Sequence, residues 1–122
     1  MPSGDLESAK SDETGHGTCC ASKAAGNLYG IAKNANLVVV KLPRAALFSD
    51  LMYALDEIEK HADLQSTWGN AVLSSSCSWI DLDPYSRADL TSMIYRLLIK
   101  GMIIVQSSGN NGSVSSAMHF YG

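Results

Sequence analysis

The chain has 122 residues, which is enough for one compact domain and too few for two of ordinary size. Apolar residues make up 46% of the chain and charged residues 17%, a balance that is typical of a globular protein and excludes a disordered one. The formal net charge of −3, without any cluster of Lys or Arg, gives no reason to expect nucleic acid or an anionic membrane as a partner. No apolar stretch approaches the roughly 20 residues of a membrane span, so no membrane-spanning segment is expected.

The first 14 residues differ in composition from the rest of the chain. Residues 1–14 are polar, rich in Ser, Asp and Glu, and without periodicity, which predicts a loop or disordered lead-in. From Gly15 onwards small residues dominate, and they predict a closely packed, buried helix that starts at His16 and ends at Gly26. We therefore expect residues 15–122 to form the folded part.

The next two segments have contrasting patterns. Residues 36–42 form a β-branched apolar run, which predicts a parallel strand covered on both faces. Apolar residues then recur at helical spacing from Phe48 to Ile58 and predict an amphipathic helix. The charged residues available for its opposite, solvent-facing side are Asp50, Asp56, Glu57, Glu59 and Lys60.

The second half continues this alternation. Residues 71–75 predict a second strand, after which the segment 76–79 turns polar. Ser86 with Asp89 resembles a capping box, and the helix that it opens ends at Gly101. Residues 102–106 predict a third strand, which runs into the glycine-rich loop 107–112.

The order helix, strand, helix, strand, helix, strand predicts an α/β fold with a parallel sheet flanked by helices. In such sheets functional groups collect beyond the carboxyl ends of the strands, here in the segments 76–79 and 107–112. Three strands leave open sheet edges, and their continuous apolar runs need cover on both faces. The pattern is that of a piece of a larger domain.

His16 is the first candidate for chemistry. A histidine between two glycines at the start of a helix is sterically open and suits a general base, although an ordinary capping histidine fits the same pattern. The segment Gly15-His16-Gly17-Thr18, followed by Ala21, resembles the G-H-G-T-x-x-A motif of the subtilisin-like serine peptidases. Residues 30–35 and the run that follows resemble the family's G-v-A-p-x-A segment and its next strand, in the same order.

Two later segments extend the resemblance. Residues 72–78 stand where the family has V-I-N-M-S-x-G, which implies that Ser76, Cys77 and Ser78 bind substrate, with Ser78 replacing the usual glycine. Residues 101–112 resemble G-v-v-v-v-a-A-A-G-N-x-G, which implies that Asn110 is the oxyanion asparagine. A simple turn is the alternative interpretation of Asn110.

The resemblance implies part of a three-layer subtilisin-like fold and a serine endopeptidase that cleaves polypeptides through an acyl-enzyme. Neither Asp5 nor Asp12 follows a strand as the family's catalytic Asp does, and no G-T-S-x-A segment with the catalytic Ser is present. Residues 15–122 are therefore expected to be a partial peptidase domain, inactive alone, with the rest of the domain missing from this chain. A noncatalytic peptide-binding remnant is the alternative, and a nucleotide-binding domain is disfavoured because no glycine-rich phosphate motif follows a strand.

The cysteines and histidines suggest no metal or cofactor. Cys20, four residues after His16, resembles the free cysteine of the proteinase-K-like branch, whereas Cys19 has no such match. Both are interpreted as small buried residues. His16, His61 and His119 lack metal-ligand spacing with one another or with the cysteines, so we expect no metal site and no cofactor. The cysteine pattern does not indicate a cellular compartment.

Overall fold

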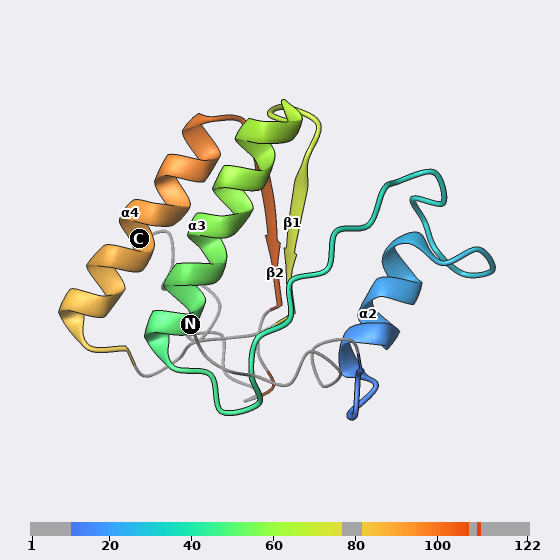
Figure 1. Cartoon of the computed structure of the whole chain (residues 1–122), viewed down its shortest axis with the longest axis horizontal. Coiled ribbons are helices and arrows are strands. Elements are labelled where there is room, and N and C mark those ends of the chain that lie inside the picture. Colours follow the sequence, from blue (N-terminus) through green and yellow to red (C-terminus); the bar gives the residue numbers. More distant parts are fainter. Residues whose placement is uncertain (1–10, 77–81, 108–109, 111–122) are drawn as a thin grey trace. The chain divides into compact units, whose positions relative to one another are not determined.

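The computed structural model describes residues 11–76, 82–107 and 110, and Figure 1 shows its elements along the chain. They are α2 (His16–Ala25), α3 (Phe48–Gln65), β1 (Val72–Ser75), α4 (Pro84–Ile99) and β2 (Ile103–Gln106). The chain divides into two compact units, Met1–Lys41 and Leu42–Gly122, which we describe separately. None of the helices in the described residues is long and apolar enough to cross a membrane.

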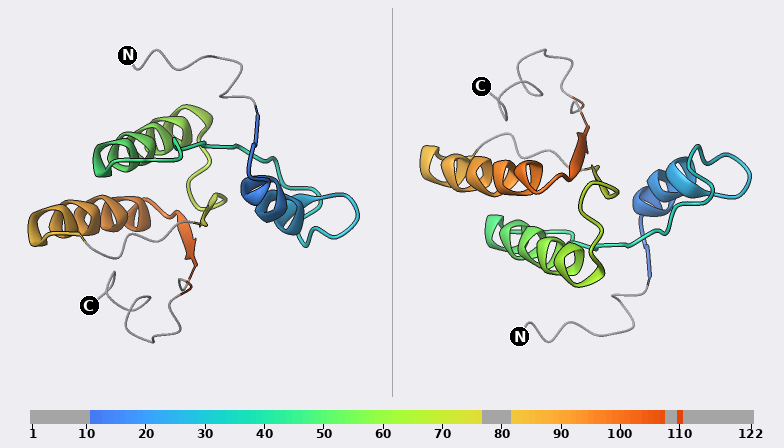
Figure 2. Two further views of the ribbon diagram at one scale, coloured as in Figure 1. Left: turned by 90° about the horizontal axis from the view of Figure 1, so that it is seen from below. Right: turned by 90° about the horizontal axis from the view of Figure 1, so that it is seen from above.

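The second unit is built as strand, helix and strand, preceded by a further helix. β1 and β2 pair in parallel, with Val72 opposite Ile103 and Ser75 opposite Gln106, and α4 connects them. α3 and α4 lie side by side along the pair of strands (Figures 1 and 2). The predicted α/β architecture with a parallel sheet is thus confirmed.

The core of the second unit lies between its two helices and one face of the sheet. Leu97 is fully enclosed, and Leu73 and Ile104, which are paired across the two strands, pack against the same cluster. The other residues of the cluster are Leu51, Leu55, Ala62, Leu90, Met93 and Met102. Val72, Ile103 and Val105 alternate with these inward positions and are more than half exposed. Only one face of the sheet is therefore covered within the described residues.

The N-cap of α4 is Asp83, three residues before the Ser86 of the predicted capping box. Pro84 occupies its first turn, where the missing N–H costs nothing, and the Asp83 carboxylate accepts hydrogen bonds from the N–H groups of Tyr85 and Ser86. The capping box of Ser86 and Asp89 is thus wrong, because Asp83 already supplies the cap. The predicted end at Gly101 is confirmed: Met102 N–H bonds Leu97 O, and Gly101 N–H bonds Leu98 O.

The first unit contains α2 and the segment that follows it. α2 runs from His16 to Ala25 and is capped by Gly26, as predicted, but none of its residues is buried within the described structure. The N–H groups of Gly30 and Ala32 bond the carbonyls of Gly26 and Ala24, so the chain folds back over the end of the helix. A Cβ atom at Gly30 would overlap the backbone of Gly26, which explains the glycine.

The strand predicted over residues 36–42 is not found. The structure assigns this run no strand, and Leu37, Val38, Val39 and Val40 are exposed. A strand is defined by the ladder that it forms with a neighbour, and no ladder to this run exists among the described residues. The β-branched pattern reports a preference for an extended chain, which becomes a strand only when a partner is supplied.

Candidate functional site

His16 is the first residue of α2, and its position follows from the glycines on either side. Gly15 has φ 72°, a left-handed conformation that favours glycine, and a Cβ atom there would meet nothing within 4 Å. His16 itself is exposed. The catalytic role of His16 remains a prediction.

The carboxylate of Asp12 caps the start of this helix. Its Oδ2 accepts the Thr18 N–H at 2.7 Å and the Thr18 hydroxyl at 2.7 Å. Its Oδ1 accepts the Gly15 N–H at 3.0 Å and the Thr14 hydroxyl at 3.3 Å. The backbone N–H of Thr18 is the largest of the contributions that lower the pKa of Asp12 to about 2. Asp12 is thus a backbone-binding carboxylate, in a geometry that sequence reasoning did not identify.

A signal for this cap is present in the sequence. Asp is among the preferred N-cap residues, and Asp12 shortly precedes the small-residue helix. The capping rule looks for the residue directly before the helix, which here is Gly15. A carboxylate acting from three residues further upstream is found only when the turn between them is known.

Two thiols follow His16 by one helical turn. The Cys20 Sγ lies 3.8 Å from the His16 Nε2, as expected for side chains four residues apart on one helix face. Cys20 is half-buried, whereas Cys19 is exposed, so the prediction that both are buried is wrong for Cys19. The cause is that no other element of the described unit packs over this side of α2.

The second group of candidate residues lies at the carboxyl end of the sheet. Ser76 follows β1 directly and is exposed, and the Ser107 N–H donates to the Ser75 carbonyl at 3.1 Å. The parallel pairing thus continues one residue beyond β2. Asn110 is exposed in a bend three residues after Ser107, a separation that the chain can span over at most about 11 Å. Ser76 and Asn110 therefore leave the same edge of the sheet, as predicted.

The remaining candidates are not brought together with this edge. Cys77 and Ser78 lie outside the described residues. His16 belongs to the first unit, whereas Ser76 and Asn110 belong to the second. Within the described ranges, no three His, Cys, Asp or Glu side chains are grouped as metal ligands.

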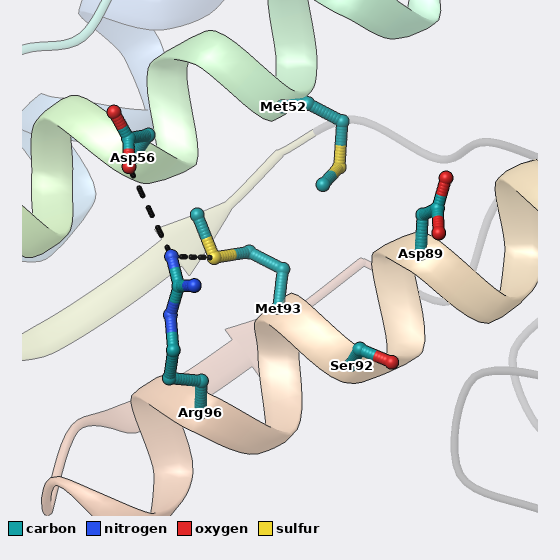
Figure 3. A pocket seen from close by; sticks show the side chains of 6 residues that line it. All are labelled: Met52, Asp56, Asp89, Ser92, Met93 and Arg96. Carbon is teal, nitrogen blue, oxygen red and sulfur yellow. Dashed lines mark hydrogen bonds and ion pairs between the residues drawn. The ribbon is translucent and has the colours of Figure 1, made fainter.

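A separate concave region lies between α3 and α4. It is an open pocket of about 460 Å³, and Figure 3 shows the side chains around it. The lining residues are Met52, Asp56, Asp89, Ser92, Met93 and Arg96. The Arg96 Nη2 lies 3.0 Å from the Met93 sulfur and 3.9 Å from an Asp56 oxygen, as the dashed lines mark. His16, Ser76 and Asn110, the predicted site residues that the structure describes, are not among the residues that line this pocket.

Comparisons with known proteins give one consistent result. The family model described as "Subtilase family" matches residues 1–120. Subtilisin-like protease 5 of Arthroderma gypseum is 30% identical over 113 residues, which are 87% of this chain and 26% of that protein. Subtilisin-like protease 11 of Arthroderma benhamiae is 44% identical over 70 residues, 55% of this chain and 18% of that protein. The chain thus spans about a quarter or less of the length of these relatives. No solved structure gives a significant match.

Proposed function

The chain belongs to the subtilase family, a family of serine peptidases, and from this premise we propose that it supplies the general base and the oxyanion donor of a serine endopeptidase. The substrate is a polypeptide, and cleavage proceeds through an acyl-enzyme on a serine. The Asp that orients the base and the Ser that attacks the substrate come from segments outside these 122 residues. The observation that carries the proposal is that His16 is exposed and is the first residue of α2, with Gly15 and Gly17 on either side.

Each candidate residue has a defined task in this mechanism. His16 takes the proton of the attacking hydroxyl and returns it to the leaving amine. The Asn110 side-chain amide donates a hydrogen bond to the oxygen that becomes negative in the tetrahedral intermediate. Ser76, Cys77 and Ser78 pair with the substrate backbone beside the scissile bond. The exposure of Asn110 and of Ser76 at the carboxyl edge of the sheet supports this assignment.

The chain alone is expected to be inactive. Because it lacks the nucleophile, it should not form a covalent adduct with a phosphonylating reagent directed at serine peptidases. Intact-mass spectrometry after incubation tests this directly. A phosphonylated serine in the 122-residue chain would contradict the assignment of the nucleophile to another segment.

The role of Asn110 is tested in a chain completed with the flanking segments of subtilisin-like protease 5 from Arthroderma gypseum. Asn110→Ala should lower kcat by roughly 10²–10³, the range known for the corresponding asparagine of subtilisin, and leave KM nearly unchanged. The reason is that the hydrogen bond forms in the transition state and hardly at all to the ground-state carbonyl. Steady-state kinetics on one chromogenic peptide give both constants.

The outcomes separate the two functions that the family admits. His16→Ala is the comparison variant and should abolish turnover. A loss of less than about fivefold in kcat for Asn110→Ala, or an effect confined to KM, would reject the oxyanion role. A completed protein that binds the peptide without hydrolysing it would favour a noncatalytic peptide-binding remnant.

A further inference from the structure

The backbone around His16 has high intrinsic conformational freedom. Glycine loses more conformational freedom on ordering than any other residue, and His16 has a glycine on each side, Gly15 and Gly17. The N-cap position is Gly15, which has no side chain to satisfy the free N–H groups of the first turn. A base in this position needs a restraint from elsewhere, because catalysis depends on holding the reacting groups in one geometry.

The restraint in the structure spans the base. One oxygen of Asp12 binds the N–H of Gly15, before His16, and the other binds the N–H of Thr18, after Gly17. The Thr18 hydroxyl adds a second bond to the same oxygen at 2.7 Å. Both ends of the Gly-His-Gly-Thr segment are thus tied to a single carboxylate, which bridges the histidine.

We propose that Asp12 is the positioning residue of the base: its carboxylate joins the amides of Gly15 and Thr18 and fixes the first turn of α2, from which the His16 side chain extends. The inference rests on the proposed role of His16. It assigns Asp12 a function distinct from that of the catalytic Asp, because both of its oxygens are used by the turn itself. The pKa of Asp12, lowered to about 2, keeps the carboxylate ionised over the whole working range of such a base.

The segment that carries Asp12 is itself anchored. The Lys41 Nζ donates to the Ser11 carbonyl at 2.8 Å, across 30 residues of sequence. This bond fixes the chain one residue before Asp12 against the end of the same unit. This exposed hydrogen bond adds a second restraint on the segment that carries the carboxylate.

Loss of the carboxylate should release the first turn and leave the rest of the helix in place. Removing an N-cap typically costs helix stability by an amount equivalent to a roughly 5- to 30-fold change in the local equilibrium. In the ¹⁵N,¹³C-labelled chain, Asp12→Ala should shift the Cα resonances of His16 and Gly17 to coil values. Those of residues 20–25 should stay helical. Asp12→Asn keeps one acceptor oxygen, so its Cα shifts should lie between those of the unsubstituted chain and those of Asp12→Ala.

Glu13→Ala is the matched control. It removes a carboxylate one residue along the chain for which the structure gives no interaction, and it should leave the His16 resonances unchanged. Equal shifts for Glu13→Ala and Asp12→Ala would overturn the inference, because a general charge effect would then explain both. Helical His16 shifts in Asp12→Ala, or coil values for His16 in the unsubstituted chain, would overturn it too.

Kinetics of the completed peptidase separate positioning from general stability. Asp12→Ala should lower kcat by about 5- to 30-fold with KM within about twofold, and Asp12→Asn should recover part of the loss. An unchanged kcat in Asp12→Ala, where His16→Ala is inactive, would refute the positioning role and leave the proposed function standing. Full activity of His16→Ala would refute the proposed function, whereas the resonance shifts would still decide whether Asp12 holds the turn.

Discussion

The carboxylate of Glu59 offers a quantitative test of the packing between α3 and α4. Its side chain is only 9% exposed, and its two oxygens lie 2.5 Å from the Arg96 Nη2 and 2.9 Å from the Lys100 Nζ. The side chains of these two cations are 51% and 36% exposed. Glu59 is the first cause of the raised pKa of Lys100, and Asp63 is the second. Water can therefore solvate the cations if Glu59 is replaced, whereas Glu59 stays covered if apolar side chains of similar size replace the cations.

This difference in exposure determines how much each substitution should lower the free energy of unfolding. Glu59→Gln keeps the volume, retains an acceptor oxygen and no longer buries a charge, so we expect a loss of about 1–2 kcal/mol in the free energy of unfolding. Replacing Arg96 and Lys100 together by Met leaves the Glu59 carboxylate buried without a partner, for which we expect a loss of about 3–5 kcal/mol. Each single replacement leaves one cation within 3 Å of the carboxylate. The two single losses should therefore sum to clearly less than the loss in the double variant.

Urea unfolding followed by far-ultraviolet circular dichroism measures these differences, because α3 and α4 supply most of the helical signal. Glu57→Gln is the control, since Glu57 lies on the same helix, is 47% exposed and pairs with the exposed Lys60. It should change the free energy of unfolding by no more than about 0.5 kcal/mol. Additive effects of the two cation replacements, or a loss for Glu59→Gln no larger than for Glu57→Gln, would refute the argument.

Three further substitutions test the ends of the helices in the second unit. Gly101 has φ 97°, so Gly101→Ala should lower the free energy of unfolding by about 1–2 kcal/mol, measured as a lower melting temperature. Ser66 has φ 53°, and Ser66→Gly should raise the free energy of unfolding by about 0.5–1 kcal/mol. The reason is that the relief of left-handed strain exceeds the entropy that a glycine adds to the unfolded chain. The Ser86 hydroxyl and N–H, with the Tyr85 N–H, lower the pKa of Asp83 from 3.8, so its stabilisation is present above about pH 4 and is lost as the pH falls through the lower folded value. Asp83→Asn should make the melting temperature less sensitive to pH below about 4, and an unchanged pH dependence would contradict the cap.

The elements with strong local signals could be predicted from the sequence. The strands at residues 72–75 and 103–106 and the helix that joins them lie where apolar periodicity and the glycine at 101 place them. The predicted start of α4 is wrong because two capping patterns overlap in the sequence. Asp83 and Pro84 form one, Ser86 and Asp89 the other, and the proline at the first helical position favours the earlier start.

The errors that remain concern partners distant in sequence. Glu59 is predicted on the solvent side of its helix, since its spacing fits the charged face, yet it is buried against Arg96 of α4 and Lys100, the C-cap of α4. Helical periodicity gives the direction of a side chain but not what a second helix presents there. The wrong strand prediction for residues 36–42 has the same cause. These residues favour an extended chain, but their sequence does not show whether a neighbouring strand will pair with them.

An aspartate caps the start of both α2 and α4, but it stands at a different distance from the first helical residue in each. In α4, Asp83 is itself the N-cap, and the first helical residue is Pro84, which needs only its fixed φ. In α2 the first helical residue is His16, and the N-cap is Gly15 with φ 72°, outside the extended region that a capping Asp or Ser normally adopts. A side chain at Gly15 would be strained by this left-handed backbone conformation. Asp12, three residues further upstream, accepts the N–H of Thr18 at the third helical position, as Asp83 accepts that of Ser86 in α4, and His16 is exposed.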